Sequence, residues 1–375
     1  MKRIKAAVIG CGVISEVYLK SLQENFTIIE VTACSDLSDE RMHRVAEHYH
    51  IKAMDWQEIL EDPSIEMILN LTSPAAHFSL SRQAMEHGKH VYSEKMMAVD
   101  YREGKRLCAL AEECQVRFGC APDTFLGGGI QTARYVVDHG LAGNILSGVL
   151  SLTRDYRVFG ENLPHLYKKG GSILYDMGGY YFTAVCSILG NVKRVSAFGK
   201  KTEDVHKVLR AGSPLYGQEL ALEEENVIAA VLEFEDQVIV TVHFNSGTII
   251  NESFHMELYG DKGIIRMGDP NIFGGEVILE KAQNQPVVFP FTHGFLKESR
   301  GLGAAEMGWA IRKGRPHRAG KEMALHVLEI IHGIFTSIKT RTVYEMETVF
   351  ERPCPLPEGF IGEGFWAADE ESAVI

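Results

Sequence analysis

The sequence predicts an α/β protein in which a doubly wound parallel sheet is followed by a second, α+β domain with an open, mostly antiparallel sheet. Three observations carry this prediction: strand-like and helix-like segments alternate as far as about residue 120, a glycine-rich turn separates the first strand from the first helix, and strand signals dominate beyond Pro122. Because 375 residues exceed what one hydrophobic core usually serves, we expect two domains, residues 1–122 and residues 123–375.

Short apolar runs mark the strands of the first domain, and amphipathic segments between them mark its helices. We expect strands at residues 4–9, 28–34, 51–54, 65–71, 90–92 and 116–120, and helices at residues 13–22, 38–49, 56–60, 75–86 and 101–113. Strands that alternate with helices in this way form a parallel sheet covered on both faces.

The second domain opens with one helix, expected at residues 129–138, and continues with alternating apolar and polar residues. This alternation predicts strands at residues 146–155, 192–198, 227–234, 237–245, 253–259 and 263–267. Turn residues separate two pairs of these strands: Glu235-Asp236 lies between the strands at 227–234 and 237–245, and residues 260–263 separate the last pair. A further apolar helix is expected to begin near Asp176 and to run through Leu189.

The net charge and the hydropathy pattern exclude two classes of partner. The chain has 50 acidic and 38 basic residues and a formal charge of −12, which argues against nucleic acid or an anionic membrane as its main partner. No stretch is long and apolar enough to span a membrane. Glycine interrupts the amino-terminal apolar run, so this run predicts a buried strand and not a signal peptide.

The cysteines and histidines show no spacing that is typical of a metal site or a disulfide framework. The seven cysteines include no C-x-x-C pair, and the fifteen histidines include no H-E-x-x-H motif. We therefore expect reduced cysteines, a cytoplasmic location and no bound metal ion.

The first motif is the turn Gly10-Cys11-Gly12-Val13-Ile14-Ser15, which ends the first strand and opens the first helix. Glycine at positions 10 and 12 lets the backbone turn tightly and approach a pyrophosphate, whose charge then faces the amino end of the helix. The turn alone could be a plain strand-to-helix connection. Its place between a strand and a helix predicts a dinucleotide site formed by residues 10–14.

An acidic residue, Asp36, ends the second strand about twenty residues further on, where a carboxylate accepts hydrogen bonds from the ribose hydroxyls. A carboxylate there repels a 2′-phosphate, so NAD is favoured over NADP. Asp36 could instead cap the helix that begins near Ser38. Because Arg41 lies nearby, NADP remains an alternative cofactor.

Two further groups follow strands of the same sheet, at the edge where doubly wound sheets bind their ligands. Glu94 and Lys95 follow the fifth strand, which places the lysine ammonium beside the cofactor. Thr72, Pro74 and His77 follow the fourth strand. They could line the cofactor site, or they could simply start an ordinary helix at proline.

The glycine-rich segment from Gly170 to Tyr181 leads into the apolar helix of the second domain. If the helix begins near Asp176, the side chains of Asp176 and Tyr180 share one face at i, i+4 spacing. On spacing alone, Asp176 could equally be a helix cap and Tyr180 a core residue.

These three motifs together resemble the Gfo/Idh/MocA family of sugar and inositol dehydrogenases over nearly the whole chain. The resemblance implies a Rossmann domain, a second domain whose sheet often supports homo-oligomers, and a carbohydrate bound over the nicotinamide with Lys95 and Asp176 as site residues. Two positions depart from the family pattern: Met96 stands where proline is usual after Glu-Lys, and Tyr180 stands where histidine is usual.

The second departure changes the expected proton acceptor. An unperturbed tyrosine titrates near about 10, well above histidine, but a nearby lysine ammonium favours the phenolate. We therefore expect Lys95 and Tyr180 to share proton transfer from the reacting hydroxyl, and Asp176 to orient that hydroxyl.

The family resemblance leaves three functions open. The first is NAD-dependent oxidation of a secondary alcohol of a sugar, sugar derivative or polyol, with a pyranose C3 as the expected position. The second is an oxidoreductive glycosidase that retains NAD, and the third is an NAD-linked sensor without activity. The sensor is disfavoured because Lys95 and Asp176 are both present.

A cluster of basic residues precedes the glycine-rich segment and could bind an anionic substituent of the substrate. Its members are Arg154, Arg157, His165, Lys168 and Lys169. A solvated basic face in an acidic protein is the alternative.

Overall fold

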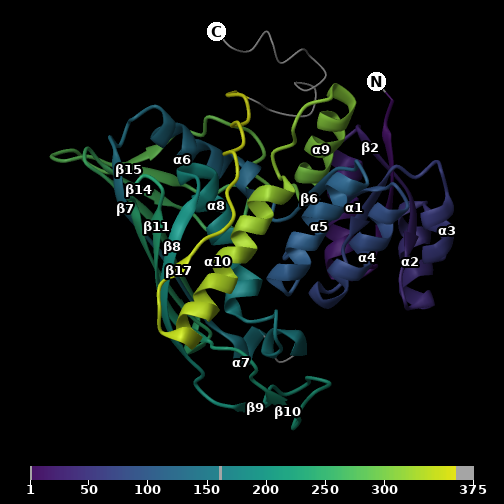
Figure 1. The fold of residues 1–375 in the computed structure, drawn as a ribbon, viewed down its shortest axis with the longest axis horizontal. Coiled ribbons are helices and arrows are strands. Elements are labelled where there is room, and N and C mark those ends of the chain that lie inside the picture. Colours follow the sequence, from purple (N-terminus) through teal and green to yellow (C-terminus); the bar gives the residue numbers. More distant parts are fainter. Residues whose placement is uncertain (1, 160–162, 360–375) are drawn as a thin grey trace.

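Six parallel strands form the amino-terminal sheet, in the order β3-β2-β1-β4-β5-β6 (Figure 1). The structure is a computed structural model that describes residues 2–159 and 163–359. The elements of this first part are β1 (Ile4–Ile9), α1 (Val13–Asn25), β2 (Ile29–Ser35), α2 (Asp39–Tyr49), β3 (Lys52–Ala53), α3 (Trp56–Glu61), β4 (Met67–Asn70), α4 (Pro74–Glu86), β5 (His90–Ser93), α5 (Tyr101–Glu113) and β6 (Phe118–Cys120). This strand order is that of a Rossmann fold, so the predicted class is confirmed.

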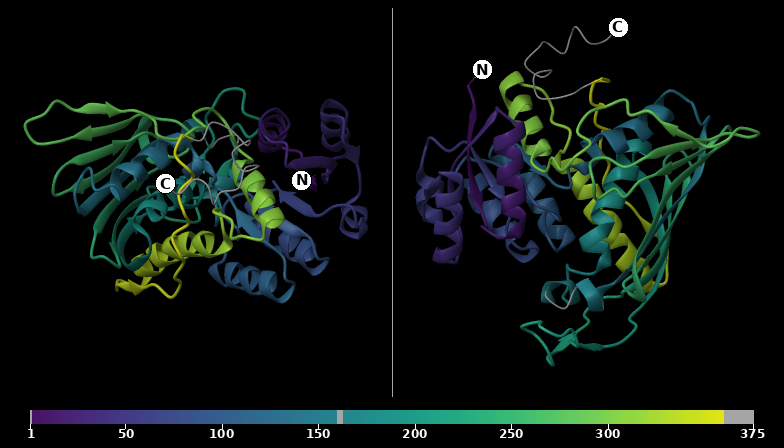
Figure 2. Two further views of the ribbon diagram at one scale, coloured as in Figure 1. Left: turned by 90° about the horizontal axis from the view of Figure 1, so that it is seen from above. Right: turned by 180° about the vertical axis from the view of Figure 1, so that it is seen from behind.

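The central strands of this sheet are apolar because helices cover both faces (Figure 2). In β1 every residue but Lys5 is buried, and all four residues of β4 are buried. The strand order reverses between β1 and β4, and doubly wound sheets bind their ligands beyond the carboxyl ends of the strands at such a reversal.

Nine strands form the second sheet, in the order β16-β15-β14-β13-β7-β12-β11-β8-β17. All neighbours pair antiparallel except β12 and β7, which are parallel, so the predicted mostly antiparallel sheet is confirmed. The elements of this part are η1 (Thr124–Leu126), α6 (Gly128–Asp138), β7 (Ile145–Asp155), α7 (Tyr156–Phe159), η3 (Pro164–Tyr167), η4 (Leu174–Gly178), α8 (Gly179–Leu189), β8 (Val192–Lys200), β9 (Val205–Lys207), β10 (Glu219–Ala221), β11 (Val227–Phe234), β12 (Ile239–Asn245), β13 (Gly247–Gly260), β14 (Ile264–Met267), β15 (Val277–Glu280), β16 (Val287–Phe289), α9 (Leu302–Lys313), α10 (Lys321–Thr340) and β17 (Tyr344–Glu345).

The last two helices join the two sheets. Helix α10 lies between them (Figures 1 and 2) and packs against β8 and α8 on one side and against α5 and β6 on the other. Helix α9 returns to the first sheet, where Gly308 lies so close that a Cβ atom would come within 3.0 Å of Ile29 Cδ1. Arg312 donates hydrogen bonds to the main-chain oxygens of Lys2 and Arg3. The domain boundary at residue 122 remains a prediction, and residues 360–375 of the second predicted domain lie outside the described residues.

The structure differs from the expected elements in several places. Helices α7, α9 and α10, the 3₁₀ turns η1 and η3 and the short strands β9, β10, β15, β16 and β17 were not predicted. Strand β13 begins at Gly247, before the expected start at residue 253. Strand β12 begins at Ile239 and not at Gln237, because Gln237 has a φ of 64° and belongs to the turn. The helix expected to begin near Asp176 starts instead with a π-helical turn, η4, and continues as α8 from Gly179.

Candidate active site

The glycine turn after β1 has the geometry of an anion site. Gly10 has a φ of 93°, and a Cβ atom there would lie 2.8 Å from the main-chain oxygen of Leu71, so only glycine fits. At Gly12 a Cβ atom would meet no described atom within 4 Å, and no described side chain caps the amino end of α1. The open backbone at the start of this helix fits a pyrophosphate.

Asp36 lies against this turn from the end of β2. Its carboxylate accepts hydrogen bonds from the main-chain N–H groups of Cys11, at 2.7 Å, and Ser38, at 2.8 Å, and from the Arg41 guanidinium at 2.7 Å. Burial alone would raise the pKa of Asp36, but these hydrogen bonds hold it below its ordinary value. The cap of α2 is Ser38, whose hydroxyl accepts from the Arg41 N–H. Asp36 is therefore an ionised acceptor beside the glycine turn.

Lys95 connects the two sheets. Its ammonium donates to the main-chain oxygen of Asp176 at 2.5 Å and lies 3.2 Å from the Asp176 carboxylate. Burial alone would lower the pKa of Lys95, but Tyr180, Asp176 and Glu94 raise it above its ordinary value. Because its pKa is raised, the ammonium stays charged at neutral pH. The side chain is 14% exposed, so a small ligand can reach it.

Glu94 braces the loop that carries Lys95. Its carboxylate accepts a hydrogen bond from the Tyr18 hydroxyl at 2.7 Å and one from the main-chain N–H of Lys95 at 3.0 Å. Tyr18 belongs to α1, so Glu94 links this loop to the helix that follows the glycine turn.

Asp176 lies in the π-helical turn η4, where it is surrounded by donors. The Tyr156 hydroxyl donates to Asp176 Oδ2 at 2.9 Å, and the Arg154 guanidinium lies 3.9 Å from the same oxygen. Burial alone would raise the pKa of Asp176, but Lys95, Tyr156 and Arg154 together lower it. Asp176 is therefore a carboxylate at neutral pH.

Tyr180 lies on the first turn of α8, beneath Lys95. The Lys95 ammonium is 4.9 Å from the centre of the Tyr180 ring. Burial raises the pKa of Tyr180, while Lys95 and a hydrogen bond from Arg300 counteract part of this rise. Two cations therefore stabilise the phenolate of a buried tyrosine.

Arg300 was missed by the sequence analysis. Its guanidinium is anchored on Asn271, at 2.7 Å from Oδ1, and it bonds to Tyr180. It stands just before α9, a helix that the sequence analysis did not predict, and no motif surrounds it. Arg300 can be recognised only from its position between the second sheet and α9, and that position is known only once the chain is folded.

The residues after β4 pack against the loop that carries Lys95. The His77 ring is buried, with Nδ1 2.7 Å from the main-chain oxygen of Met96 and Nε2 2.9 Å from that of Thr72. The Thr72 hydroxyl donates to Asn70 at 2.7 Å, and Pro74 is the first residue of α4. His77 thus joins the loops that follow β4 and β5.

The structure brings only part of the basic cluster to this site. Arg154 lies near Asp176, and the charges of Asp176 and Lys95 act on His165, whose pKa is lowered by burial of its ring. Arg157 instead pairs with Asp155 at 2.8 Å, and Lys168 pairs with Glu223 at 3.1 Å. Lys169 lies 3.9 Å from Asp100.

The described residues offer neither a metal site nor a membrane span. Within residues 2–159 and 163–359, no three His, Cys, Asp or Glu side chains are grouped so that they could hold a metal ion. In the same part of the chain, no helix has the length and apolar character needed to cross a bilayer.

Curated relatives share part of the chain. An uncharacterised oxidoreductase of Schizosaccharomyces pombe is 26% identical over 202 residues, 52% of this chain and 54% of the relative. D-xylose dehydrogenase of Paenarthrobacter nicotinovorans is 28% identical over 41% of this chain and 40% of its own length. Inositol 2-dehydrogenase of Salmonella typhimurium is 27% identical over 28% of this chain and 32% of its own length. The chain thus matches about half, or less, of the length of these relatives.

Solved structures share the whole fold. Levoglucosan dehydrogenase in complex with NADH and L-sorbose superposes with a TM-score of 0.80 at 17% identity, over 92% of this chain and 99% of that one. Aldose-aldose oxidoreductase from Caulobacter crescentus, complexed with glycerol, gives a TM-score of 0.76 at 17% identity, over 92% of this chain and 100% of that one. At these identities the likeness shows the fold alone.

Two family profiles match consecutive parts of the chain. The profile of the oxidoreductase family with an NAD-binding Rossmann fold matches residues 4–121. The profile of the Gfo/Idh/MocA carboxyl-terminal domain matches residues 130–266. Together they span most of the chain, which therefore belongs to the Gfo/Idh/MocA family of oxidoreductases.

Proposed function

We propose that this protein transfers a hydride between a secondary alcohol of a sugar, sugar derivative or polyol and the nicotinamide of NAD. One observation carries the proposal: Lys95, Asp176 and Tyr180 meet beyond the carboxyl end of β5, in the sheet that carries the glycine turn. The named sugar and inositol dehydrogenases among the relatives support a carbohydrate substrate.

Residues 10–14 and Asp36 would hold the dinucleotide. The backbone of the turn would receive the pyrophosphate, and the Asp36 carboxylate would accept from the ribose hydroxyls. The charge of Asp36 disfavours a 2′-phosphate, and the charge of Arg41 is already balanced by its ion pair with Asp36. We therefore propose NAD in preference to NADP. When bound, NAD supplies the acceptor for the hydride.

Tyr180 is the proposed proton acceptor, and Lys95 acts through its charge. Lys95 already carries its proton, because its pKa is raised, and it cannot accept another. The pKa of Tyr180 is also raised, because Lys95 and Arg300 counteract only part of the effect of burial, so Tyr180 takes the proton of the substrate hydroxyl only in the fraction of molecules that carry the phenolate, and this fraction grows with pH. Asp176 would orient that hydroxyl, and Arg154 and His165 would contact other groups of the sugar.

Thr72, Pro74, His77 and Glu94 are proposed to shape the nicotinamide side of the site. Glu94 and His77 both bind the backbone of the loop around Lys95. Their role is to fix the height of Lys95 over the substrate. Among the positions of a pyranose we propose C3 as the one oxidised, on the family resemblance.

A second candidate function is an oxidoreductive glycosidase, and the buried phenol of Tyr180 favours it. Oxidation at C3 acidifies the C2 proton, so the aglycone can be eliminated; water then adds and the ketone is reduced. The elimination needs an acid near the leaving oxygen, and a tyrosine with a raised pKa is protonated at neutral pH. In this case NAD is regenerated in every turnover.

The outer face of the second sheet supports a homo-oligomer. Phe198 is 77% exposed there, and Val231 and Ile239 on the next two strands are 41% and 39% exposed. Exposed apolar groups on the face of a sheet favour association with a second copy. Light scattering of the wild type and of Phe198→Lys tests this. The variant should have a smaller molar mass in solution, because a charge on this face disfavours association.

The function itself is tested with a panel of sugars, polyols and aryl glycosides. NADH formation and aglycone release are followed separately in each reaction. Stoichiometric NADH with an intact glycosidic bond supports the dehydrogenase. Aglycone release without net NADH supports the glycosidase, and neither signal with any compound would reject both.

A further inference from the structure

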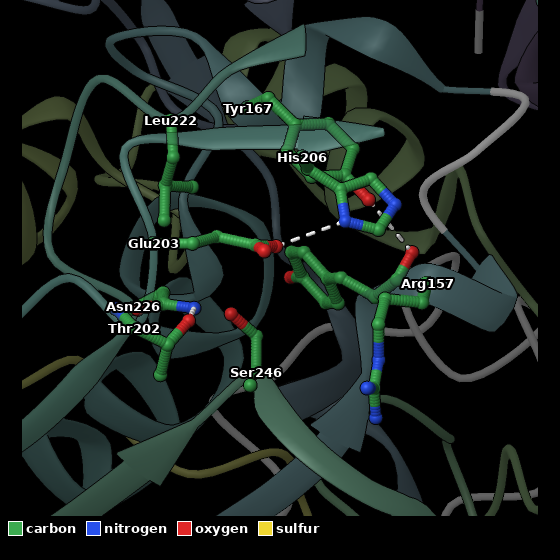
Figure 3. A pocket seen from close by; sticks show the side chains of 10 residues that line it. Arg157, Tyr167, Thr202, Glu203, His206, Leu222, Asn226 and Ser246 are labelled. Carbon is green, nitrogen blue, oxygen red and sulfur yellow. Dashed lines mark hydrogen bonds and ion pairs between the residues drawn. The ribbon is translucent and has the colours of Figure 1, made fainter. Parts of the chain in front are cut away.

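Polar side chains of the pocket beside α7 and η3 bond to one another (Figure 3). The pocket has a volume of about 140 Å³, and on its wall the His206 ring lies 2.9 Å from the Glu203 carboxylate. A ligand would have to displace such bonds. Asp123 is a buried carboxyl group without a part in the proposed chemistry, and it binds the backbone next to Arg300, a partner of Tyr180.

Asp123 caps the start of α9 from a distant part of the chain. It follows β6 and is 1% exposed. Its Oδ2 atom accepts hydrogen bonds from the main-chain N–H groups of Gly301, at 2.9 Å, and Gly303, at 3.0 Å. The first N–H groups of a helix have no partner within the helix, and Gly301 has no side chain that could accept from them. Asp123 therefore supplies the missing acceptor.

Two glycines let the backbone at the start of α9 come close to its neighbours. Gly301 has a φ of 100°, and a Cβ atom there would lie 2.9 Å from the side chain of Leu22. At Gly303 a Cβ atom would lie 2.2 Å from the Tyr92 hydroxyl oxygen and 2.9 Å from the Asp123 Cβ atom. The segment is therefore packed tightly as well as hydrogen-bonded, which leaves it little room to shift.

Arg300 directly precedes this fixed backbone. Its guanidinium donates to the main-chain oxygen of Asn271 at 3.1 Å and to Asn271 Oδ1 at 2.7 Å, and it bonds to Tyr180. The side chain is 12% exposed. Arg300 is thus held at its guanidinium by Asn271 and at its backbone by the hydrogen bonds of Asp123 to the next residues.

The charged and titratable groups around this connection come from α1, from β5 and its following loop, and from the start of α9. Those that interact electrostatically with Asp123 are Tyr18, Tyr92, Glu94 and Arg300. Burial raises the pKa of Tyr180, and the charged groups that act on it most strongly are Lys95, Glu94 and Arg300. The charge of Asp123 acts on Arg300, so its influence on Tyr180 passes through Arg300.

We propose that Asp123 is a positioning residue that holds Arg300 against the Tyr180 phenol by accepting the N–H groups of Gly301 and Gly303. The inference rests on the proposed function, in which Tyr180 accepts the proton of the substrate. Without the acceptor, two buried N–H groups would lose their partner, and the backbone that carries Arg300 would move to satisfy them. The role needs an oxygen at this position and not a charge, because one carbonyl oxygen accepts two hydrogen bonds.

A titration of Tyr180 in the full-length protein tests the proposal without any substrate. The phenolate absorbs in the near ultraviolet where the phenol does not, and the difference between each protein and the same protein with Tyr180→Phe isolates this residue. Asp123→Ala removes the acceptor, and Asp123→Asn keeps an oxygen without the charge. If Asp123→Ala does not fold, Asp123→Ser takes its place, because its shorter side chain cannot reach both N–H groups. Exposed Asp39→Ala is the control.

Asp123→Ala should move the midpoint of the Tyr180 titration to higher pH by about one unit, in the same direction as Arg300→Leu. Asp123→Asn and Asp39→Ala should stay near the wild type. Asp123→Ala combined with Arg300→Leu should shift no further than Arg300→Leu alone, because no guanidinium is left to position.

An unchanged midpoint in Asp123→Ala, or a full additional shift in the double variant, would overturn the inference. A shift to lower pH in both Asp123→Ala and Asp123→Asn would also overturn it, because the charge of Asp123 would then act on Tyr180 directly. Turnover with NAD is recorded in parallel: failure to oxidise any sugar would count against the proposed function, whereas the titration alone decides on Asp123.

Discussion

The ammonium of Lys95 donates a hydrogen bond to the main-chain oxygen of Asp176 at 2.5 Å, across the junction of the two sheets. Lys95 follows β5 of the first sheet, and Asp176 lies in the π-helical turn η4 of the second part of the chain. Neither part alone forms the site. The Lys95 ammonium, which would act on the substrate, comes from the sheet with the glycine turn. The Asp176 carboxylate, which pairs with that ammonium, comes from the second part of the chain.

Replacing Lys95 with alanine should lower turnover by at least about a hundredfold, the usual scale for a positioned acid–base group. The loss arises because Tyr180 loses the ammonium that stabilises its phenolate. NAD affinity should stay near that of the wild type when measured by calorimetry, because Lys95 contacts neither the glycine turn nor Asp36. Lys52→Ala, at an exposed position on β3, is the control; equal effects of both variants would show that Lys95 has no part in the chemistry.

Replacing Asp36 with alanine should narrow the preference for NAD over NADP. A hydrogen bond to a charged group contributes about 1.5–3 kcal/mol, so NAD affinity should fall roughly ten- to a hundredfold. NADP affinity should fall less, or rise, because Arg41 is released from its partner. Calorimetry with both dinucleotides measures the gap, with exposed Asp39→Ala as control; a wild type that binds NADP as tightly as NAD would contradict this assignment.

The pH profile of oxidation should depend on Arg300. Turnover should rise with pH as Tyr180 loses its proton, because only the phenolate accepts the proton of the substrate. Without Arg300 the pKa of Tyr180 rises further, so Arg300→Leu should move the rising limb to higher pH. Turnover at neutral pH should fall about tenfold, which corresponds to about 1.4 kcal/mol.

Two further variants separate this effect from a loss of structure. Arg300→Lys keeps a cation and should restore most of the profile, and Tyr180→Phe should abolish the rising limb. A profile that is the same in the wild type and in Arg300→Leu would mean that Arg300 only anchors Asn271.

Asp123 should make the stability of the protein depend on pH. It is buried, and burial raises its pKa from 3.8 to about 7, although the N–H groups of Gly301 and Gly303 oppose this rise. Between these two pH values the folded state binds more protons than the unfolded state, so the free energy of unfolding contributed by this group falls as pH rises toward 7.

Asp123→Asn removes this titration. Denaturant unfolding at a series of pH values measures the free energy of unfolding. Between about pH 4 and 7 this free energy should change less in the variant than in the wild type, by up to about 4 kcal/mol over the range. Asp39→Asn, at an exposed position, should keep the slope of the wild type. An unchanged slope in Asp123→Asn would place the titration on another group.

The first sheet could be predicted from sequence because its signals are local. Each strand of this sheet is a short apolar run followed by a turn. In the turn Gly10-Cys11-Gly12, glycine is required at position 10 because the backbone there lies against the main chain of Leu71. Helix α9 gave no such signal, because its residues are buried on nearly all sides and contain Gly303 and Gly308. Its partners are β2 and β6, and only the closed fold brings them together.

The candidate site divides in the same way. Lys95, Asp176 and Tyr180 could be named from motifs, since each follows a strand end or a glycine-rich turn. Their geometry could not, because η4 is a π-helical turn and changes the spacing that an ordinary helix would give. Arg300 depends on contacts across the chain, and Arg157 and Lys168 are paired with acids that sequence could not assign to them.

The central claim is tested most directly by one reaction. A substrate from the sugar panel, deuterated at the carbon to be oxidised, is incubated with wild-type protein and excess NAD, and the cofactor is recovered. We predict deuterium at C4 of the nicotinamide, one equivalent per substrate oxidised, and none with Lys95→Ala in the same time. Oxidation that leaves the recovered cofactor without deuterium, or equal labelling by wild type and Lys95→Ala, would contradict the account.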